Sequence, residues 1–340
     1  MITVLEPGRF TSFQDGGRSG LAHMGVPQAG AADSLSLRQA NLLAGNLEYA
    51  TALEMTSSGP TLRFETDAVV AFAGARVEPY LDGVPLPMYQ SITINAGQIL
   101  ACGRLLTGMR CYLAIAGGFS PHTTLASRSL DTLCGLGPPI LRADDQIDSE
   151  PHRLHQGWYL RSPPEYPDEL RIRVIPGPHE AWFASRSLEM LISMTFEVRA
   201  ESDRTGLRLG GDSIPRKTRA ELPSQGMVTG AIQVPSDGHP IVLLSNHGTT
   251  GGYPVIAVVI HADLPYLGQL RAGSRVQFRA VSREQALAAH QSAETGLKAS
   301  IVSADAGLLA ARSLMVLAKA HPSLRQVCLQ QGQWRVQLRR

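Results

Sequence analysis

Short apolar runs separated by glycine and proline follow one another along the chain, and this pattern limits the fold most strongly. The 340 residues include 33 glycines and 22 prolines, which are spread throughout rather than clustered. Runs of strand length lie between them, as within 60–74 and at 255–260. Apolar runs this short, bounded by turn-forming residues, are typical of β-strands. The pattern therefore predicts a mainly β protein with many tight connections.

Three segments have helical spacing instead. Residues 31–46 place leucines and alanines around one face, with Asp33 or Ser34 as the N-cap and a Gly-Asn stop. Residues 282–291 begin with a capping serine, and 303–322 form a further amphipathic stretch that ends at His-Pro. Caps and stops of this kind delimit helices. We therefore expect a few helices among the strands.

The length of the chain exceeds that of one typical domain, so two domains are expected. The composition turns polar and proline-rich between 143 and 169, where we place the boundary. The predicted units are an N-terminal domain at 1–165, a C-terminal domain at 166–285 and a helical tail at 286–340. The last helix is expected to pack on the second domain or on a neighbouring chain.

Composition excludes several classes of function. The net charge is only +2, without a basic cluster interleaved with aromatic residues, which disfavours nucleic-acid binding. The four cysteines have neither CxxC pairing nor metal-ligand spacing, so we expect reduced thiols, no metal site and a cytoplasmic protein. The start, MITVLEPGRF, lacks the pattern of a signal peptide, and the apolar runs are too short for a membrane span.

The segment SNHGTTGGYP, 245–254, joins two apolar runs and is unusually polar. It supplies Asn246, His247, Thr249, Thr250, Gly251, Gly252 and Tyr253. Paired glycines allow successive backbone N–H groups to converge, and the threonine hydroxyls can donate beside them. Such a concavity binds carboxylate, phosphate or an oxyanion, while histidine titrates near neutral pH. The alternative is a tight strand connection whose threonines satisfy their own backbone.

Two further loops contain arginine beside glycine. FQDGGRSG, 13–20, includes Gln14, Asp15 and Arg18 on an expected exposed turn, and ESDRTGLRL, 201–209, includes Arg204. The planar guanidinium suits a carboxylate or phosphate. The alternatives are an Asp15–Arg18 pair that closes its own loop and a solvated charged turn. GxGxxG, Walker, GxSxG and HExxH motifs do not occur.

Taken together, these motifs resemble a known family. VLEPGRFTSFQDGGRSGLAHMGVPQAGAAD, LEMTSSGPTLRF, SRSLD and TTGGYPVIAVVIHADLPYLGQLRAGSRVQF follow in order between residue 4 and about 285. They are similar to the C-type subunit of 5-oxoprolinase, to KipA and to the carboxyltransferase part of urea amidolyase, also called allophanate hydrolase subunit 2. The resemblance implies two cyclophilin-like β-barrel domains.

The resemblance also implies partners and a reaction. It implies a KipI-like partner protein and a LamB/YcsF-like partner protein, with ATP-dependent opening of 5-oxoproline to glutamate by a hydrolase complex that needs all of them. The substrate would be a small carboxylate or amide, and ATP would act at the level of the complex. One alternative is a carboxyltransferase that takes a carboxyl group from biotin. Another is a non-catalytic, KipA-like regulator of a KipI-like protein.

Candidate site residues follow from the motifs that match. We expect catalytic roles for Arg204, Asn246, His247 and Thr250, and substrate binding by Gln14, Asp15, Arg18, Thr249, Gly251, Gly252 and Tyr253. Two positions depart from the usual ADxQTTGGYP, because Asn246 replaces Asp and Gly248 replaces Gln. The usual SNRMG is SDRTG here, with Arg204 retained. Loss of a charge and an amide predicts altered or reduced catalysis.

Overall fold

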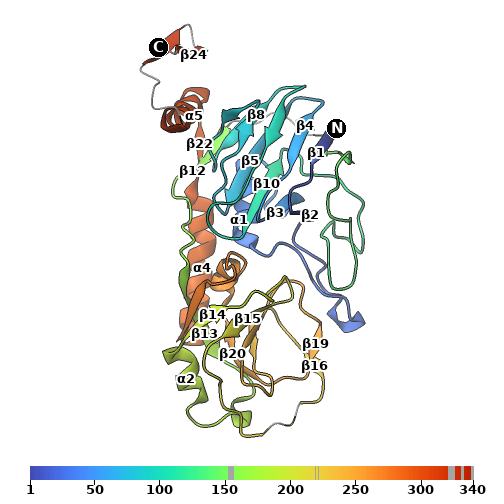
Figure 1. Ribbon diagram of the computed structural model, residues 1–340, viewed down its shortest axis with the longest axis vertical. Coiled ribbons are helices and arrows are strands. Elements are labelled where there is room, and N and C mark those ends of the chain that lie inside the picture. Colours follow the sequence, from blue (N-terminus) through green and yellow to red (C-terminus); the bar gives the residue numbers. More distant parts are fainter. Residues whose placement is uncertain (152–156, 219, 221, 321–325, 331–332, 338–340) are drawn as a thin grey trace.

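A computed structural model describes residues 1–340 except 152–156, 219, 221, 321–325, 331–332 and 338–340. Two bodies of strands lie one above the other in Figure 1, and helix α4 (Arg283–Ser300) runs beside both. The mainly β architecture with few helices confirms the predicted fold class.

The N-terminal half consists of two sheets whose neighbouring strands run antiparallel. The larger has the order β11-β1-β4-β9-β6-β7, from β1 (Ile2–Glu6), β4 (Thr61–Phe64), β6 (Tyr80–Leu81), β7 (Val84–Pro85), β9 (Ile99–Ala101) and β11 (Gln146–Ile147). The smaller has the order β2-β3-β10-β5-β8, from β2 (Phe10–Gln14), β3 (Ala52–Thr56), β5 (Ala68–Gly74), β8 (Ser91–Ile94) and β10 (Arg110–Ile115).

The five-stranded sheet is buried on both faces around β5, which explains why that strand is apolar throughout. Side chains alternate along β5, so that Val70 and Phe72 join the core shared with the six-stranded sheet. Ala71 and Ala73 point the other way, against helix α1 (Ser34–Leu43). Small residues on that face let the helix pack closely.

Helix α1 begins as the sequence predicts. The side chain of Asp33 accepts a hydrogen bond from the backbone N–H of Ser36 at 2.9 Å, which satisfies one free amide of the first turn. Residue Gly45 follows the helix with a φ of 80°. That left-handed conformation suits glycine and ends the helix.

The C-terminal half closes into a seven-stranded barrel, in the order β13-β20-β17-β18-β15-β14-β21. Its strands are β13 (Glu169–Pro176), β14 (Thr195–Val198), β15 (Gly206–Gly210), β17 (Ala231–Gln233), β18 (Ile241–Leu243), β20 (Val255–Val259) and β21 (Arg275–Ala280). The pair β13–β21 is parallel and closes the barrel. A separate ladder joins β16 (Gln225–Gly226) to β19 (Thr250–Gly251).

Both halves also contain short helices. They are η1 (Ala22–Met24), η2 (Glu180–Trp182), η3 (His261–Asp263), α2 (Ser187–Ser193) and α3 (Leu264–Leu267). None of the helices in the described ranges is both long and apolar enough to cross a bilayer.

The C-terminal segment corrects two expectations. It is not purely helical: after α4 the chain forms β22 (Ile301–Ala304), which pairs antiparallel with β12 (Gly157–Leu160), and then α5 (Ala306–Ala320), β23 (Gln326–Gln330) and β24 (Gln333–Gln337). Helix α5 packs on the N-terminal half, against β7, β12 and β22, rather than on the second domain. Its Arg312 Nε donates to Gln90 Oε1 at 2.9 Å.

Helix α4 carries the chain back from the barrel to the first half. At its start, Ser282 Oγ accepts from the Gln285 backbone N–H at 3.2 Å, and Gln285 Oε1 accepts from the Ser282 N–H at 2.9 Å. Further along, Glu294 binds both terminal nitrogens of Arg38 on α1 at 2.6 Å. The helix therefore bridges the two halves.

We predict that Ser282→Ala lowers the free energy of unfolding by about 1 kcal/mol, because it removes half of a capping box. Urea denaturation monitored by circular dichroism measures the change. The matched control is Ser292→Ala at an exposed position inside the same helix, where alanine favours the helix and no loss is expected. Equal losses in the two variants would contradict the capping role.

Candidate functional site

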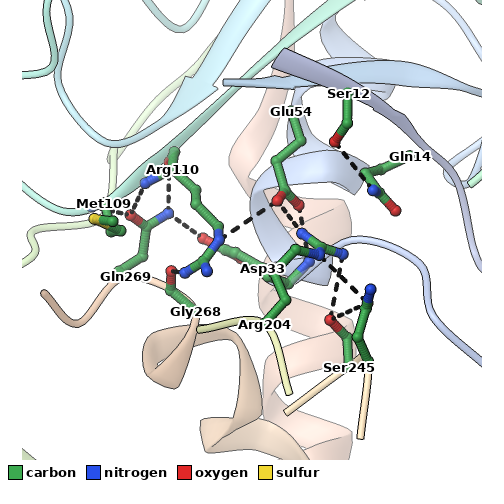
Figure 2. A network of polar contacts seen from close by, with 12 residues as sticks. Ser12, Gln14, Asp33, Glu54, Met109, Arg110, Arg204, Ser245, Gly268 and Gln269 are labelled. Carbon is green, nitrogen blue, oxygen red and sulfur yellow. Dashed lines mark hydrogen bonds and ion pairs between the residues drawn. The ribbon is translucent and has the colours of Figure 1, made fainter. Parts of the chain in front are cut away.

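Buried charged residues join the two halves of the molecule (Figure 2). Glu54, on β3 of the first half, is fully buried and pairs with Arg204 of the second half. Arg110 Nε lies 3.4 Å from the same Glu54 oxygen, and the Tyr112 hydroxyl donates to the other oxygen at 2.7 Å. One carboxylate thus holds two guanidinium groups that come from different halves.

The charge of Glu54 is maintained despite its burial. Burial by itself would raise the pKa of this carboxyl group, but Arg204, Arg110 and the Tyr112 hydroxyl outweigh it and hold the pKa below its usual value. Glu54 is therefore ionised at neutral pH, and its position in an otherwise apolar strand is explained by its partners.

A second set of bonds crosses the boundary beside the first. Gln269 Nε2 donates to Asp33 Oδ2 at 2.6 Å and to the Arg110 carbonyl at 2.8 Å. Its Oε1 accepts from the backbone N–H groups of Met109 and Arg110 at 3.1 Å, while Arg110 Nη1 donates to the Gly268 carbonyl. Every polar atom of the Gln269 side chain is thereby used between the halves.

Arg204 and Asn246 lie in this boundary rather than on a surface turn. Arg204 is 6% exposed, and besides Glu54 it donates to the Gly30 carbonyl and to Asn246 Oδ1. Asn246 is fully buried, and its Nδ2 donates to Asp131 Oδ1 at 3.3 Å. The expectation of a solvated charged turn at Arg204 is therefore wrong, since its guanidinium is needed to pair with Glu54.

Gln14, Asp15 and Arg18 hold the segment 124–130. Arg18 is 2% exposed and donates to the carbonyls of Thr124 and Ser129 at 3.1 and 2.6 Å. Asp15 accepts from the hydroxyls of Ser127 and Ser129 and from backbone N–H groups, and Gln14 Nε2 donates to the Leu130 carbonyl. The expected exposed turn is thus folded inward at Arg18, and Asp15 binds these serines.

Two residues of the glycine-rich segment lie in a β-ladder. Thr250 and Gly251 lie in β19 and pair with Gly226 and Gln225 of β16. The Thr249 carbonyl accepts from the Met227 N–H at 2.9 Å, and the Gly252 carbonyl accepts from the Leu222 N–H at 2.8 Å. A Cβ at Gly251 would lie 2.7 Å from Gln233 Nε2, so a larger residue there would require the Gln233 side chain to move.

A cleft of about 720 Å³ lies between the halves. On one side it is lined by the loop that contains Asp15 and by residues 27–32, and on the other by Ser245, His247 and Thr249 of the barrel. The loops at 13–20 and 245–254 therefore face one another across this cleft. Arg18, Thr250, Gly252 and Tyr253 are not among the residues that line this cleft.

His247 is the histidine of this cleft that the sequence singled out. Its Nδ1 lies 2.7 Å from the Gly248 carbonyl, which accepts a hydrogen bond from Nδ1–H and leaves Nε2 free as an acceptor. Burial lowers the pKa of His247 below its ordinary value of 6.5, and the bond to Gly248 opposes this only partly. The imidazole is therefore neutral at pH 7 and can accept a proton.

Sequence reasoning missed residues that join the halves. These are Glu54, Arg110 and Gln269, together with Asp33 in its role as a partner of Gln269. A signal existed for Glu54, because a lone carboxylate inside a buried strand needs a cation. Nothing in the sequence pairs it with Arg204, which is 150 positions away. The described residues contain no group of three or more His, Cys, Asp or Glu side chains that could hold a metal ion.

Comparison with known proteins gives a consistent result. Residues 24–280 match the family described as the carboxyltransferase domain, subdomain A and B. The C-type subunit of the 5-oxoprolinase of Escherichia coli K12 is 37% identical over 297 residues, which cover 86% of this chain and 94% of that protein.

Larger proteins contain a similar region. The urea amidolyase of Saccharomyces cerevisiae is 30% identical over 326 residues, covering 87% of this chain but only 17% of that protein. The crystal structure of the K. lactis urea amidolyase superimposes with a TM-score of 0.80 at 28% identity, covering 88% of this chain and 20% of that one.

We predict that Glu54→Gln lowers the free energy of unfolding by about 3–5 kcal/mol, because it leaves two buried guanidinium groups without their countercharge. Denaturant titration at pH 7 measures the loss. The control is Glu78→Gln, which removes the carboxylate of an exposed ion pair with Arg76 and should change stability by less than about 1 kcal/mol. A Glu54→Gln variant as stable as this control would contradict the role of Glu54.

Proposed function

We propose that this chain, which belongs to the family of the carboxyltransferase domain, subdomain A and B, is the C-type subunit of a cytoplasmic, ATP-dependent 5-oxoprolinase complex. The observation that carries the proposal is the match to the corresponding 5-oxoprolinase protein of Escherichia coli, which extends over 94% of that protein at 37% identity. The complex would open the lactam of 5-oxoproline with water to give glutamate, together with a KipI-like partner and a LamB/YcsF-like partner.

The cleft between the halves supports a role in binding and proton transfer. His247 offers a neutral imidazole with a free Nε2, and Thr249 and Ser245 line the same cleft. A neutral histidine can take a proton from an attacking water or return one to a leaving nitrogen. Arg204 and Asn246 would act as positioning residues. Asn246 is buried within the Ser245–His247 turn, and the buried Arg204 donates to Asn246 Oδ1 and to Ser245 Oγ.

We assign ATP to the partner proteins. A phosphate site requires free backbone N–H groups or cations that converge on one point. Within the TTGG segment, Thr250 and Gly251 are paired with β16. Arg18 and Arg204 are both committed to buried protein partners.

We expect the purified chain alone to show no 5-oxoproline hydrolysis, and the activity to appear when the KipI-like and LamB/YcsF-like partners and ATP are added. Glutamate release measured by a coupled assay tests this. Inactivity with authentic, folded partners that do bind the chain would reject the catalytic proposal and favour the regulatory alternative.

In that reconstituted complex, we predict that His247→Gln lowers kcat/KM by about a hundredfold or more, as expected for the loss of an acid–base group. The wild-type complex should lose activity on the acid side only as the pH falls below 6.5, because burial lowers the pKa of His247 and the neutral ring is the active form. His122→Gln, at an exposed position outside the cleft, is the matched control. An unchanged acid limb in His247→Gln would exclude His247 as the base.

The second candidate is a carboxyltransferase, favoured by the family description and by the match to urea amidolyase. When bound, biotin would supply a transferable carboxyl group. The hydroxyl and imidazole groups of Ser245, His247 and Thr249 fit its ureido ring as hydrogen-bonding partners. Carboxylation of urea by this chain with a carboxylated biotin carrier protein would support this candidate. Its absence, together with active 5-oxoproline hydrolysis, would reject it.

A further inference from the structure

A second hollow, of about 310 Å³, lies on the outer face of the barrel. Side chains alternate along β15, so Leu207 and Leu209 fill the barrel core while Gly206 and Arg208 face outward. Ile241 and Leu243 of β18 form the apolar floor. Gly206 leaves room in the outward row, where a Cβ would lie 3.0 Å from Ile241 Cγ2.

The TTGG segment separates this hollow from the cleft between the halves. Thr249 lines the cleft and Thr250 lines the hollow, as expected for successive residues of an extended chain. His247 lines both. Leu133 extends from the N-terminal half to complete the wall, so the hollow is also formed by both halves.

Arg208 supplies the positive charge of this hollow. Across the described ranges, no side chain forms a hydrogen bond or ion pair with its guanidinium group. Asp203 Oδ1 accepts from the N–H and hydroxyl of Thr205 and from the Gly206 N–H, and within the described ranges this carboxylate forms no ion pair with Arg208. Arg208 thus differs from Arg18 and Arg204, whose donors point into the protein.

Neutral polar groups surround that charge. Gln233 is 6% exposed, and its Nε2 makes only a weak contact with Met227 Sδ at 3.4 Å. Thr250 lines the hollow beside it. At Gly248 a Cβ would meet only the Thr250 carbonyl, at 3.4 Å, so this position is open toward the hollow. The arrangement combines one cation, amide and hydroxyl groups, and an aliphatic floor.

We propose that this hollow binds a small carboxylate that also carries an amide, with the carboxylate on Arg208, the amide on Gln233 and Thr250, and the carbon skeleton on Ile241 and Leu243. A guanidinium group holds a carboxylate through charge-assisted hydrogen bonds, and the neutral groups suit an amide. The proposal rests on the proposed function in one respect, since it names Arg208 as the residue that recognises the carboxylate of 5-oxoproline. Sequence reasoning gave that role to Arg18.

Calorimetric titration of the full-length chain, without partners or ATP, tests the site. The probes are 5-oxoprolinate and 2-pyrrolidinone, which has the same lactam ring without the carboxylate. We expect 5-oxoprolinate to bind at least about tenfold more tightly, because an ionised group strengthens the hydrogen bonds. Arg208→Gln should remove this preference, and Arg208→Lys should restore part of it.

A matched control completes the test. Arg171→Gln, at an exposed arginine of β13 outside the hollow, should leave binding unchanged. Melting temperatures confirm that each variant is folded. Absence of saturable 5-oxoprolinate binding to the wild-type chain, or equal binding by wild type and Arg208→Gln, would overturn the proposal.

The outcomes for the site and for the proposed function are separable. A reconstituted complex that hydrolyses 5-oxoproline with an unchanged KM in Arg208→Gln would reject this site and leave the proposed function intact. If 5-oxoprolinate binds through Arg208 but the reconstituted complex shows no hydrolysis, this site is supported and the proposed function is rejected.

Discussion

The buried pairing of Glu54 with Arg204 is the interaction on which the arrangement of this molecule depends. Two β bodies could pack in many orientations through apolar surfaces alone, because such contacts are not directional. A desolvated carboxylate with two guanidinium partners permits far fewer orientations of the two halves. In any other orientation a charge would be left unpaired inside the protein, which is energetically costly. Gln269 adds directional bonds beside it. The cleft between the halves therefore has a defined shape without a ligand.

The use of arginines in buried contacts has a chemical consequence for the site. Arginines that a motif suggests for substrate binding are used to hold the structure, at Arg204 between the halves and at Arg18 beneath the segment 124–130. The cleft itself retains hydroxyl groups and a neutral imidazole, as suits proton transfer, and positive charge is displaced to Arg208 on the far side of the TTGG segment. The strand β19 thus separates two environments of different polarity.

Local patterns predicted the elements well where neighbouring residues decide the outcome. The caps at Asp33 and Ser282 and the strands at 60–74 all form as expected, because hydrogen bonds within a few residues and alternation of side chains determine them. The strand Ile301–Ala304 was missed, since its partner β12 lies far away in the sequence. Intrinsic strand propensity gives little guidance where pairing with a distant segment determines whether a strand forms.

The sequence by itself determined a mainly β chain, its family, and the presence of polar, glycine-rich loops at 13–20 and 245–254. Only the tertiary structure decided what the charged side chains in those loops do. Whether an arginine is free or buried depends on the residues that approach it from other segments, as Glu54 does for Arg204 and Ser129 for Arg18. Burial and partners set the role of a charge, and neither is a property of the local sequence.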